Sequence, residues 1–187
     1  AHEIGVKQVA YYLWNKFGSS HRVQFISVPF DDVVTEIFKS VSEPYMGVML
    51  KRLMLIASEK IADTMKIDAL VTGESVAQVS SQTLRNLALI DQATNKLVLR
   101  PLAMMSKPDI IEIANNIGTS RFAESMPEYC SVISKNPVTH GNYDRIASEA
   151  RRFDYSVLDE AVRTSVFVNV DEIAQDVSEI GQMEVVS

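Results

Sequence analysis

The seven glycines of the chain are the first residues to test for nucleotide chemistry, because phosphate-binding loops are built from closely spaced glycines. Neither a G-x-G-x-x-G turn nor a G-x-x-x-x-G-K loop can be written anywhere in the sequence. The usual sequence signature of a phosphate cradle is therefore missing from these 187 residues. The glycines are never closer than thirteen residues, at positions 5, 18, 47, 73, 118, 141 and 181.

Hydrogen-bonding residues follow the short apolar run 69–72, which Gly73 ends. A glycine at this place lets a ligand approach the backbone closely. The hydroxyl groups of Ser75, Ser80 and Ser81 and the amide of Gln82 offer donors and acceptors nearby. Spacing alone is equally typical of an ordinary strand-to-helix turn with its caps, so both interpretations stay open.

Two adjacent cations, Lys51 and Arg52, interrupt the apolar stretch 48–57. Such a pair could hold a phosphate group. It could also lie on the solvent side of a helix with its aliphatic stems packed on the surface.

Cys130 is the only cysteine, and it follows Pro127 in an irregular segment. A cysteine in a loop can be a reactive thiol, although most lone cysteines behave as small buried apolar groups. The histidines His2, His21 and His140 are scattered and make no metal-binding spacing. A Ser-His-Asp arrangement has no local signature either.

Alternating helices and strands must position these groups. Helical spacing of apolar residues predicts helices over 2–17, 31–42, 45–66, 82–91 and 106–118, and two more across 142–165. Apolar runs predict strands over 22–30, 69–72 and 96–99. This alternation indicates an α/β fold, a parallel sheet flanked by helices. Ligands of such sheets bind beyond the carboxyl ends of the strands, which are here Pro29-Phe30, Thr72-Gly73-Glu74 and Arg100-Pro101.

Several ends and faces of these elements can be predicted as well. Asp31 or Asp32 is expected to cap the second helix, and Ser106 with Asp109 forms a variant of the capping box. Gly118 is expected to end the helix that this box begins. The unbroken apolar run 69–72 predicts a strand covered on both faces.

The composition excludes several classes of protein. An apolar fraction of 47% excludes wholesale disorder, and no apolar run approaches the ~18 residues of a membrane span. The single cysteine excludes an internal disulfide framework and a Cys-rich zinc site. The first residues lack the basic and apolar regions of a secretory signal. We therefore expect a soluble, cytoplasmic globular domain without a membrane partner.

The charge of the chain is concentrated at its end. The formal net charge is −6, yet residues 171–187 hold five acidic residues and no Lys or Arg. Residues 1–170 are thus nearly neutral and nothing in the global charge indicates nucleic-acid binding. We expect 1–170 to form one domain and 171–187 to be an acidic tail or linker.

Five motifs that stand in order along the chain closely resemble those of the tRNA 4-thiouridine synthetase family (tRNA uridine 4-sulfurtransferase), in its catalytic domain. The resemblance runs over nearly the whole chain, and the combination of the second, third and last motifs is the most specific. The motifs are Leu50-Lys51-Arg52, Val71-Thr72-Gly73-Glu74-Ser75, Gln78-Val79-Ser80-Ser81-Gln82-Thr83-Leu84, Leu99-Arg100-Pro101-Leu102 and Met126-Pro127-Glu128-Tyr129-Cys130.

The resemblance implies an adenine-nucleotide alpha-hydrolase-like fold (a PP-loop ATP pyrophosphatase) with a mostly helical C-terminal part. In this family a Ser-Gly-Gly-x-Asp-Ser loop lies upstream of the segment matched here, and many members continue into a rhodanese domain. We therefore expect 1–170 to be a catalytic domain lacking its phosphate-binding loop, and 171–187 to lead toward a rhodanese domain. Such a fragment is expected to be inactive alone. It is also expected to aggregate or self-associate, because a neighbouring strand of the sheet would be missing.

The resemblance also implies an enzyme, an ATP-dependent tRNA sulfurtransferase. ATP, with Mg²⁺, activates O4 of uridine 8, and sulfur arrives as a persulfide on the rhodanese cysteine, having come from a cysteine desulfurase. The position that matches the family's redox-active thiol is Cys130. The same sulfur feeds thiamin thiazole synthesis through a sulfur carrier protein.

Carried over by position, Lys51, Gly73 and Gln82 match the family's ATP contacts. Arg145, Arg151 and Arg152 could form a basic edge for tRNA, or a solvated helix face. Two other functions stay open. One is a PP-loop ATP pyrophosphatase with a different acceptor, which would not need Cys130, and the other is a non-catalytic interaction module.

Overall fold

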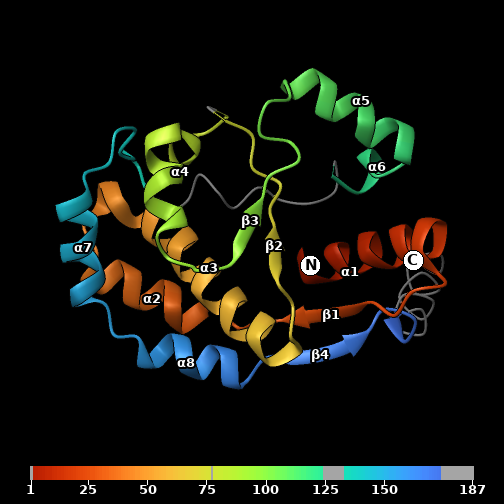
Figure 1. Ribbon diagram of the computed structural model, residues 1–187, viewed down its shortest axis with the longest axis horizontal. Coiled ribbons are helices and arrows are strands. Elements are labelled where there is room, and N and C mark those ends of the chain that lie inside the picture. Colours follow the sequence, from red (N-terminus) through yellow and green to blue (C-terminus); the bar gives the residue numbers. More distant parts are fainter. Residues whose placement is uncertain (1, 77, 124–132, 174–187) are drawn as a thin grey trace, which may run out of the picture. The chain divides into compact units, whose positions relative to one another are not determined.

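The computed structural model describes residues 2–76, 78–123 and 133–173, which divide into two compact units (Figure 1). The described parts of 1–28, 111–128 and 165–187 form unit 1. The described parts of 29–110 and 129–164 form unit 2. Within the described ranges, no helix is long and apolar enough to cross a membrane.

Unit 2 is built around one long helix, α3 (Met46–Met65). This helix contacts α2 (Asp31–Ser40), α4 (Leu84–Asp91), α7 (Tyr143–Arg152) and α8 (Ser156–Arg163), and also strand β2 (Ala69–Val71). Its buried face supplies much of the core, including Met49 and Leu53, because apolar residues recur there at helical spacing. The other elements are η2 (Glu43–Tyr45), η3 (Ser80–Gln82) and β3 (Leu97–Leu99).

Strands β2 and β3 pair in parallel, with Leu70 opposite Val98, which confirms the parallel arrangement of these two runs. The prediction that β2 is covered on both faces is wrong: Val71 is 68% exposed and its neighbour on the same face, Leu97, is 62% exposed. The physical reason is that a face is covered by elements packed above or below the sheet, which pairing with β3 along the strand edge does not supply. Helix α3 packs against β2, but the face that carries Val71 is left open.

The helix ends of unit 2 follow the predictions with two corrections. Asp31 and Asp32 lie in the first turn of α2, where their negative charges complement the helix dipole, while Phe30 takes the N-cap position without a side-chain bond. Helix α4 begins at Leu84 instead of Gln82, because Ser80–Gln82 forms a 3₁₀ turn first. Thr83 then caps α4 by accepting a hydrogen bond from the Asn86 backbone N–H at 3.2 Å.

The capping box opens helix α5 (Lys107–Ile117) as predicted. The Ser106 hydroxyl donates to the Asp109 carboxylate at 2.5 Å, and the Asp109 backbone N–H donates back to that hydroxyl at 3.3 Å. Gly118 ends α5 with a φ of +85°, as its position predicts. The Tyr12 hydroxyl, which donates to the Ile117 carbonyl at 2.9 Å, lies where a Gly118 side chain would be.

Unit 1 contains an antiparallel pair of strands that the sequence analysis did not predict. Strand β1 (Gln24–Ser27) pairs with β4 (Val166–Asn169), so the predicted strand at 22–30 has an antiparallel neighbour among the described residues. The chain that follows β4 stays packed as far as Ile173, which is buried. The rest of the predicted tail, 174–187, lies outside the described residues. The helical elements of this unit are α1 (His2–Leu13), η1 (Trp14–Gly18), the part of α5 from residue 111 and α6 (Ser120–Ala123).

Candidate functional site

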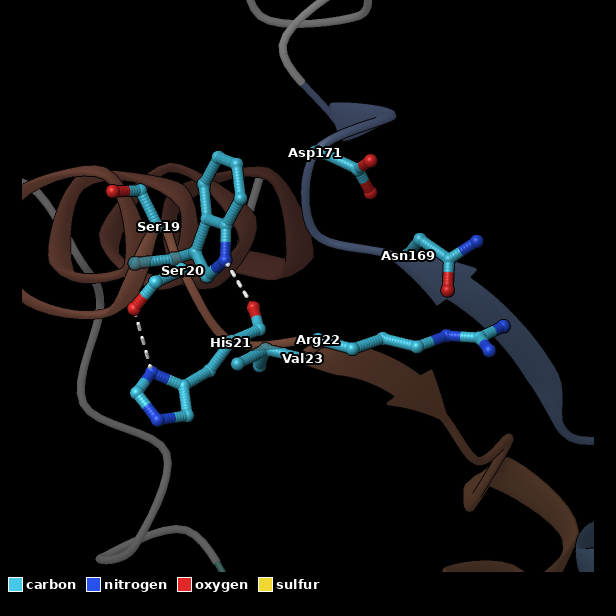
Figure 2. A pocket seen from close by; sticks show the side chains of 8 residues that line it. Ser19, Ser20, His21, Arg22, Val23, Asn169 and Asp171 are labelled. Atoms are coloured by element: carbon cyan, nitrogen blue, oxygen red, sulfur yellow. Dashed lines mark hydrogen bonds between the residues drawn. The ribbon is translucent and has the colours of Figure 1, made fainter.

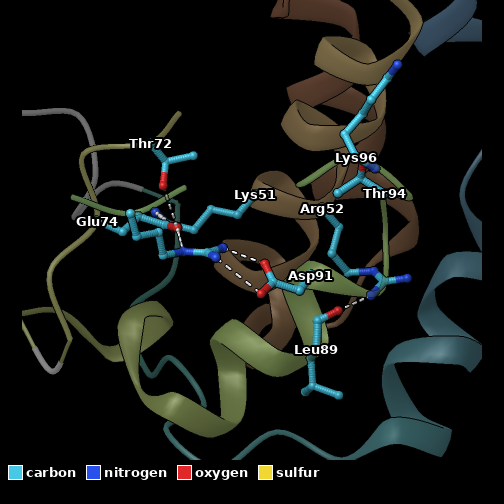
Figure 3. Close-up of polar contacts among 9 residues, drawn as sticks. Lys51, Arg52, Thr72, Glu74, Leu89, Asp91, Thr94 and Lys96 are labelled. Carbon is cyan, nitrogen blue, oxygen red and sulfur yellow. Dashed lines mark hydrogen bonds and ion pairs between the residues drawn. The ribbon is translucent and has the colours of Figure 1, made fainter. Parts of the chain in front are cut away.

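Lys51 and Glu74 meet at the carboxyl end of β2. Lys51 projects from α3, and its ammonium group donates to the Glu74 Oε1 at 2.7 Å (Figure 3). Glu74 follows Gly73 directly and is only 7% exposed. The predicted phosphate-binding lysine thus lies beside the predicted glycine, held there by a buried carboxylate.

The second oxygen of Glu74 is bound from β3. Arg100, which follows β3, donates from Nε to Glu74 Oε2 at 2.8 Å, and the Thr72 hydroxyl donates to the same oxygen at 3.1 Å. The two terminal nitrogens of Arg100 donate to the Asp91 carboxylate at 3.1 and 2.5 Å. Four charged side chains from α3, α4 and the ends of β2 and β3 therefore form one linked set, Lys51, Glu74, Arg100 and Asp91 (Figure 3).

This linked set keeps its groups charged. Burial alone would raise the pKa of the Glu74 carboxyl, but the hydrogen bonds from Lys51 and Arg100 hold it below its ordinary value. Burial alone would likewise lower the pKa of Arg100, but Asp91 and Glu74 raise it. Parallel strands bring their carboxyl ends to one edge of the sheet, and this is the edge where a site was predicted.

Gly73 leaves open space beside this set. A Cβ built at Gly73 meets no atom within 4 Å, and its φ is not positive. Neither the backbone conformation nor a neighbour in the described chain therefore requires a glycine here. A ligand that approaches the backbone closely would require one.

Gln82 is the last residue of η3, and its side-chain oxygen is buried without a hydrogen-bond partner among the described residues. The backbone of this turn is satisfied, since the Gln82 N–H donates to the Val79 carbonyl at 2.8 Å. Buried polar atoms in proteins are almost always paired, so the donor for this oxygen is absent from the described residues. The structure thus brings Lys51 and Gly73 together through Glu74, and it puts Gln82 in the next turn of the same unit.

Arg52 does not lie on a solvent face, because its guanidinium is bound within the fold. It donates to the Leu89 carbonyl near the end of α4, and burial lowers the pKa of its guanidinium. The interpretation of Lys51 and Arg52 as a surface pair is therefore wrong for both residues. The reason is that α3 is packed on several sides, so its polar positions also meet other elements.

The three arginines of α7 are exposed, and two of them pair with a buried carboxylate of the same helix. Arg145 and Arg152 both bind the carboxylate of Glu149, which is fully buried at 0% exposure. Glu149 also accepts hydrogen bonds from the backbone N–H of Ser42 at 3.0 Å and from its hydroxyl at 2.6 Å. Burial alone would raise the pKa of Glu149, but the bonds from Ser42 and Arg152 hold it below its ordinary value. Glu149 therefore ties α7 to the segment that follows α2, whereas Arg145 and Arg152 pair with it inside α7 and keep about half of their side chains exposed.

The predicted redox thiol, Cys130, lies outside the described residues. The described chain resumes at Ile133, and Glu43 binds the next three residues. Its carboxylate accepts from the backbone N–H of Asn136 at 2.8 Å and from the Ser134 hydroxyl at 2.9 Å, and these bonds lower its pKa.

Sequence reasoning assigned no role to Glu74 or Arg100, although both stand in the quoted motifs. The signal that could have found them is their position. Each follows a predicted parallel strand, so their opposite charges must meet at one edge. The described residues contain no group of three or more His, Cys, Asp or Glu side chains that could hold a metal ion.

Unit 1 contains a hollow of about 330 Å³ that none of the predicted site residues lines. Figure 2 shows part of its lining, including His21, Arg22 and Asp171. The Trp14 ring N–H donates to the His21 carbonyl at 2.9 Å. Arg22 and Asp171 both line it and carry opposite formal charges, which cancel. Its residues are Trp14, Ser19, Ser20, His21, Arg22, Val23, Asn169 and Asp171.

Comparisons with known proteins agree with the motifs. The tRNA sulfurtransferases of Pseudomonas putida and Azotobacter vinelandii are 53% and 54% identical to this chain, over 100% and 96% of its length. The chain spans 39% and 37% of those two proteins. It is also similar to a 4-thiouridine synthetase in a crystal structure of its RNA complex with bound ATP. That match has a TM-score of 0.82 and 30% identity, and it covers 88% of this chain and 44% of the other.

These similarities confirm the resemblance and the α/β fold class. A family profile described as thiamine biosynthesis protein (ThiI) matches residues 1–155, which is most of the chain. The chain therefore belongs to the ThiI family.

Proposed function

We propose that this chain is the nucleotide-binding part of an enzyme that uses ATP to transfer sulfur to tRNA, converting uridine 8 to 4-thiouridine. The observation that carries the proposal is the likeness in fold to a 4-thiouridine synthetase bound to RNA and ATP. The names of the relatives, tRNA sulfurtransferase, support the same reaction. Because the chain spans about two fifths of those relatives, the activity belongs to the longer protein.

The residues at the carboxyl end of β2 suit ATP. The ammonium of Lys51 can bind a phosphate as a point charge. The open space over Gly73 fits a ligand that lies against the backbone. The unpaired oxygen of Gln82 can accept a hydrogen bond from the adenine amino group. These three features support ATP contacts at the positions that the family resemblance predicts.

The chemistry proceeds in three displacements. The uridine O4 attacks the α-phosphorus of ATP, and pyrophosphate leaves. The terminal sulfur of an enzyme persulfide then attacks C4, and AMP leaves. The thiolate of Cys130 finally attacks the remaining enzyme sulfur, so that 4-thiouridine is released and an internal disulfide forms. An external dithiol must reduce that disulfide before the next turnover.

The remaining partners are those that this reaction requires. Mg²⁺ accompanies ATP, mainly through the phosphate oxygens. A cysteine desulfurase supplies sulfur to a rhodanese cysteine of the longer protein, and a sulfur carrier protein takes sulfur for thiazole synthesis. The substrate tRNA makes the cytoplasm the site of action.

Thiolation by the full-length protein tests the proposal. The assay contains tRNA, ATP, Mg²⁺, cysteine desulfurase and cysteine, and 4-thiouridine is measured by nucleoside mass spectrometry. We expect ATP-dependent thiolation, which disappears when uridine 8 of the tRNA is replaced by cytidine. ATP cleavage to pyrophosphate without thiolation would indicate a different acceptor, and no ATP binding at all would indicate an interaction module.

A further inference from the structure

We propose that Asn86 is a positioning residue of this nucleotide site, which holds the turn that carries Gln82 against the segment 138–141. The inference rests on the proposed function, because it concerns how the ATP base is read. Asn86 stands near the start of α4, four residues after Gln82, and its side chain has no predicted role in the sequence.

The side chain of Asn86 is fully buried, with 0% exposure, and it is bound on both sides. Its Nδ2 donates to the Ser80 carbonyl at 2.7 Å and to the Val138 carbonyl at 2.8 Å. Its Oδ1 accepts from the Gly141 backbone N–H at 3.0 Å. The side-chain amide thus binds three backbone groups, two through its N–H hydrogens and one through its oxygen.

The three backbone groups come from two separate segments. Ser80 is the first residue of the 3₁₀ turn that ends with Gln82, so a bond to its carbonyl fixes that turn. Val138 and Gly141 come from a segment more than fifty residues further along the chain. Without Asn86, the backbone groups that it binds in both segments would lose this hydrogen-bond partner, which is costly where the groups are buried.

Neighbouring bonds show that this contact is specific in shape. A Cβ at Gly141 would lie 2.8 Å from Asn86 Oδ1 and 2.5 Å from a Leu89 methyl carbon, so only glycine lets the backbone come this close. The Thr83 hydroxyl donates to the Thr139 carbonyl at 2.7 Å, and Arg85 Nε donates to the Gly141 carbonyl at 2.9 Å. The segment 138–141 therefore packs closely against the turn that carries Gln82 and fixes the position of this turn.

Loss of the Asn86 contacts is expected to affect recognition of the adenine base more than binding of the phosphates. Gln82 presents an unpaired acceptor, which suits the 6-amino group of adenine and opposes the 6-oxo group of guanine. Lys51 is held by Glu74 instead, in a set of contacts that Asn86 does not join. Displacing the Gln82 turn should therefore reduce the preference for ATP over GTP, while phosphate binding persists.

Substitution of Asn86 in the full-length protein tests this inference. Asn86→Asp keeps the shape of the side chain and the acceptor for Gly141. It replaces the NH₂ group by a carboxylate oxygen, which repels the carbonyl oxygens of Ser80 and Val138. The matched control is Asn142→Asp, because Asn142 uses only its side-chain oxygen to cap α7 and aspartate does the same. A second variant, Gly141→Ala, disturbs the contact from its other side.

The measurement is the dissociation constant of ATP and of GTP for each variant, with thermal unfolding recorded in parallel. We expect Asn86→Asp to weaken ATP binding at least tenfold and GTP binding less than threefold, and Gly141→Ala to act in the same direction. Asn142→Asp should match the wild type. Equal weakening of both nucleotides, or unchanged selectivity in whichever of the two variants folds, overturns the inference. A wild-type protein that does not bind ATP contradicts the proposed function itself.

Discussion

A side chain added at Gly73 would meet empty space, and the amide oxygen of Gln82 is buried without a partner in the described part of the chain. At the scale of single residues, these features separate binding from folding. When the fold requires a group, its substitution disturbs the packing or hydrogen bonds of its neighbours and lowers stability. A group that only a ligand requires can be changed with little effect on stability.

Gly73→Val is expected to leave the thermal unfolding of the full-length protein unchanged, because nothing lies within 4 Å of the added Cβ. ATP affinity should fall, since the new methyl groups occupy the space where a ligand would approach the backbone. Calorimetric unfolding and ATP titration on the same preparation check this pair of outcomes. A variant that binds ATP normally would remove Gly73 from the site.

Lys51→Ala is expected to weaken ATP binding by roughly 1.5–3 kcal/mol, the range for a hydrogen bond between charged partners. Lys60→Ala is the matched control, because Lys60 lies on the same helix and pairs with Asp159 at an exposed position. Isothermal titration of both variants with ATP compares them. Equal affinities would show that Lys51 serves only its ion pair with Glu74.

At the scale of elements, the linked set of Lys51, Glu74, Arg100 and Asp91 joins two helices to the ends of two strands. Each strand is only three residues long, so its backbone bonds alone would hold its end weakly. The buried carboxylate of Glu74 binds cations from both sides and keeps the end of β2 in register with the end of β3. This set therefore supports both the sheet and the lysine of the site.

Glu74→Gln is expected to destabilise the protein by about 1–3 kcal/mol, because two cations lose a charged acceptor in a buried place. The stability from Glu74 also depends on pH. Its carboxyl pKa is lowered in the folded protein, so this stability is complete above the ordinary glutamate pKa and is lost as the pH falls through the lowered value.

Urea unfolding of wild type and Glu74→Gln from neutral to acidic pH measures this effect. The two curves should converge as the pH falls, since protonation of Glu74 removes the same charge. Glu160→Gln is the control, as Glu160 pairs with Arg163 on an exposed helix face and should matter little. A difference between wild type and Glu74→Gln that stays constant with pH would contradict the role of its charge.

At the scale of the whole molecule, the chain spans about two fifths of its relatives, and the β2–β3 sheet has an exposed apolar face. Val71, Leu97 and Leu99 share this face, and β2 pairs only with β3 in the described part of the chain. An open strand edge beside exposed apolar side chains favours association.

The 187-residue chain expressed alone is therefore expected to self-associate or aggregate. Sedimentation velocity over a range of concentrations should show species larger than 20.8 kDa. Val71→Lys should reduce this association, whereas Met54→Lys, at an exposed position of α3, should reduce it less. A monomer at every concentration would contradict the prediction.

Cys130→Ser in the full-length protein is expected to preserve folding and ATP binding and to reduce 4-thiouridine formation strongly over multiple turnovers. The reason is that serine cannot form the proposed disulfide, whose formation would free 4-thiouridine from the enzyme sulfur. A comparison of single-turnover and multiple-turnover thiolation with cysteine desulfurase checks this. Normal multiple turnover would show that the thiol is structural.

Much of the architecture could be predicted from local patterns in the sequence. The long helix α3, the capping box at Ser106 and the end of α5 at Gly118 depend on spacing and capping within a few residues. These features involve neighbours in the chain, so the sequence alone determines them. The family could also be identified from the sequence, because several short motifs occur together in one order.

Tertiary structure decided what each polar side chain binds. The sequence could not show that Arg52 meets the end of α4, that Glu149 holds two of the arginines of α7, or that Asn86 joins two segments more than fifty residues apart. It also missed β4, whose partner β1 is far away in the chain. Hydrogen bonds and ion pairs of this kind form between groups that only the folded chain brings within about 3 Å, and no local pattern encodes such a distance.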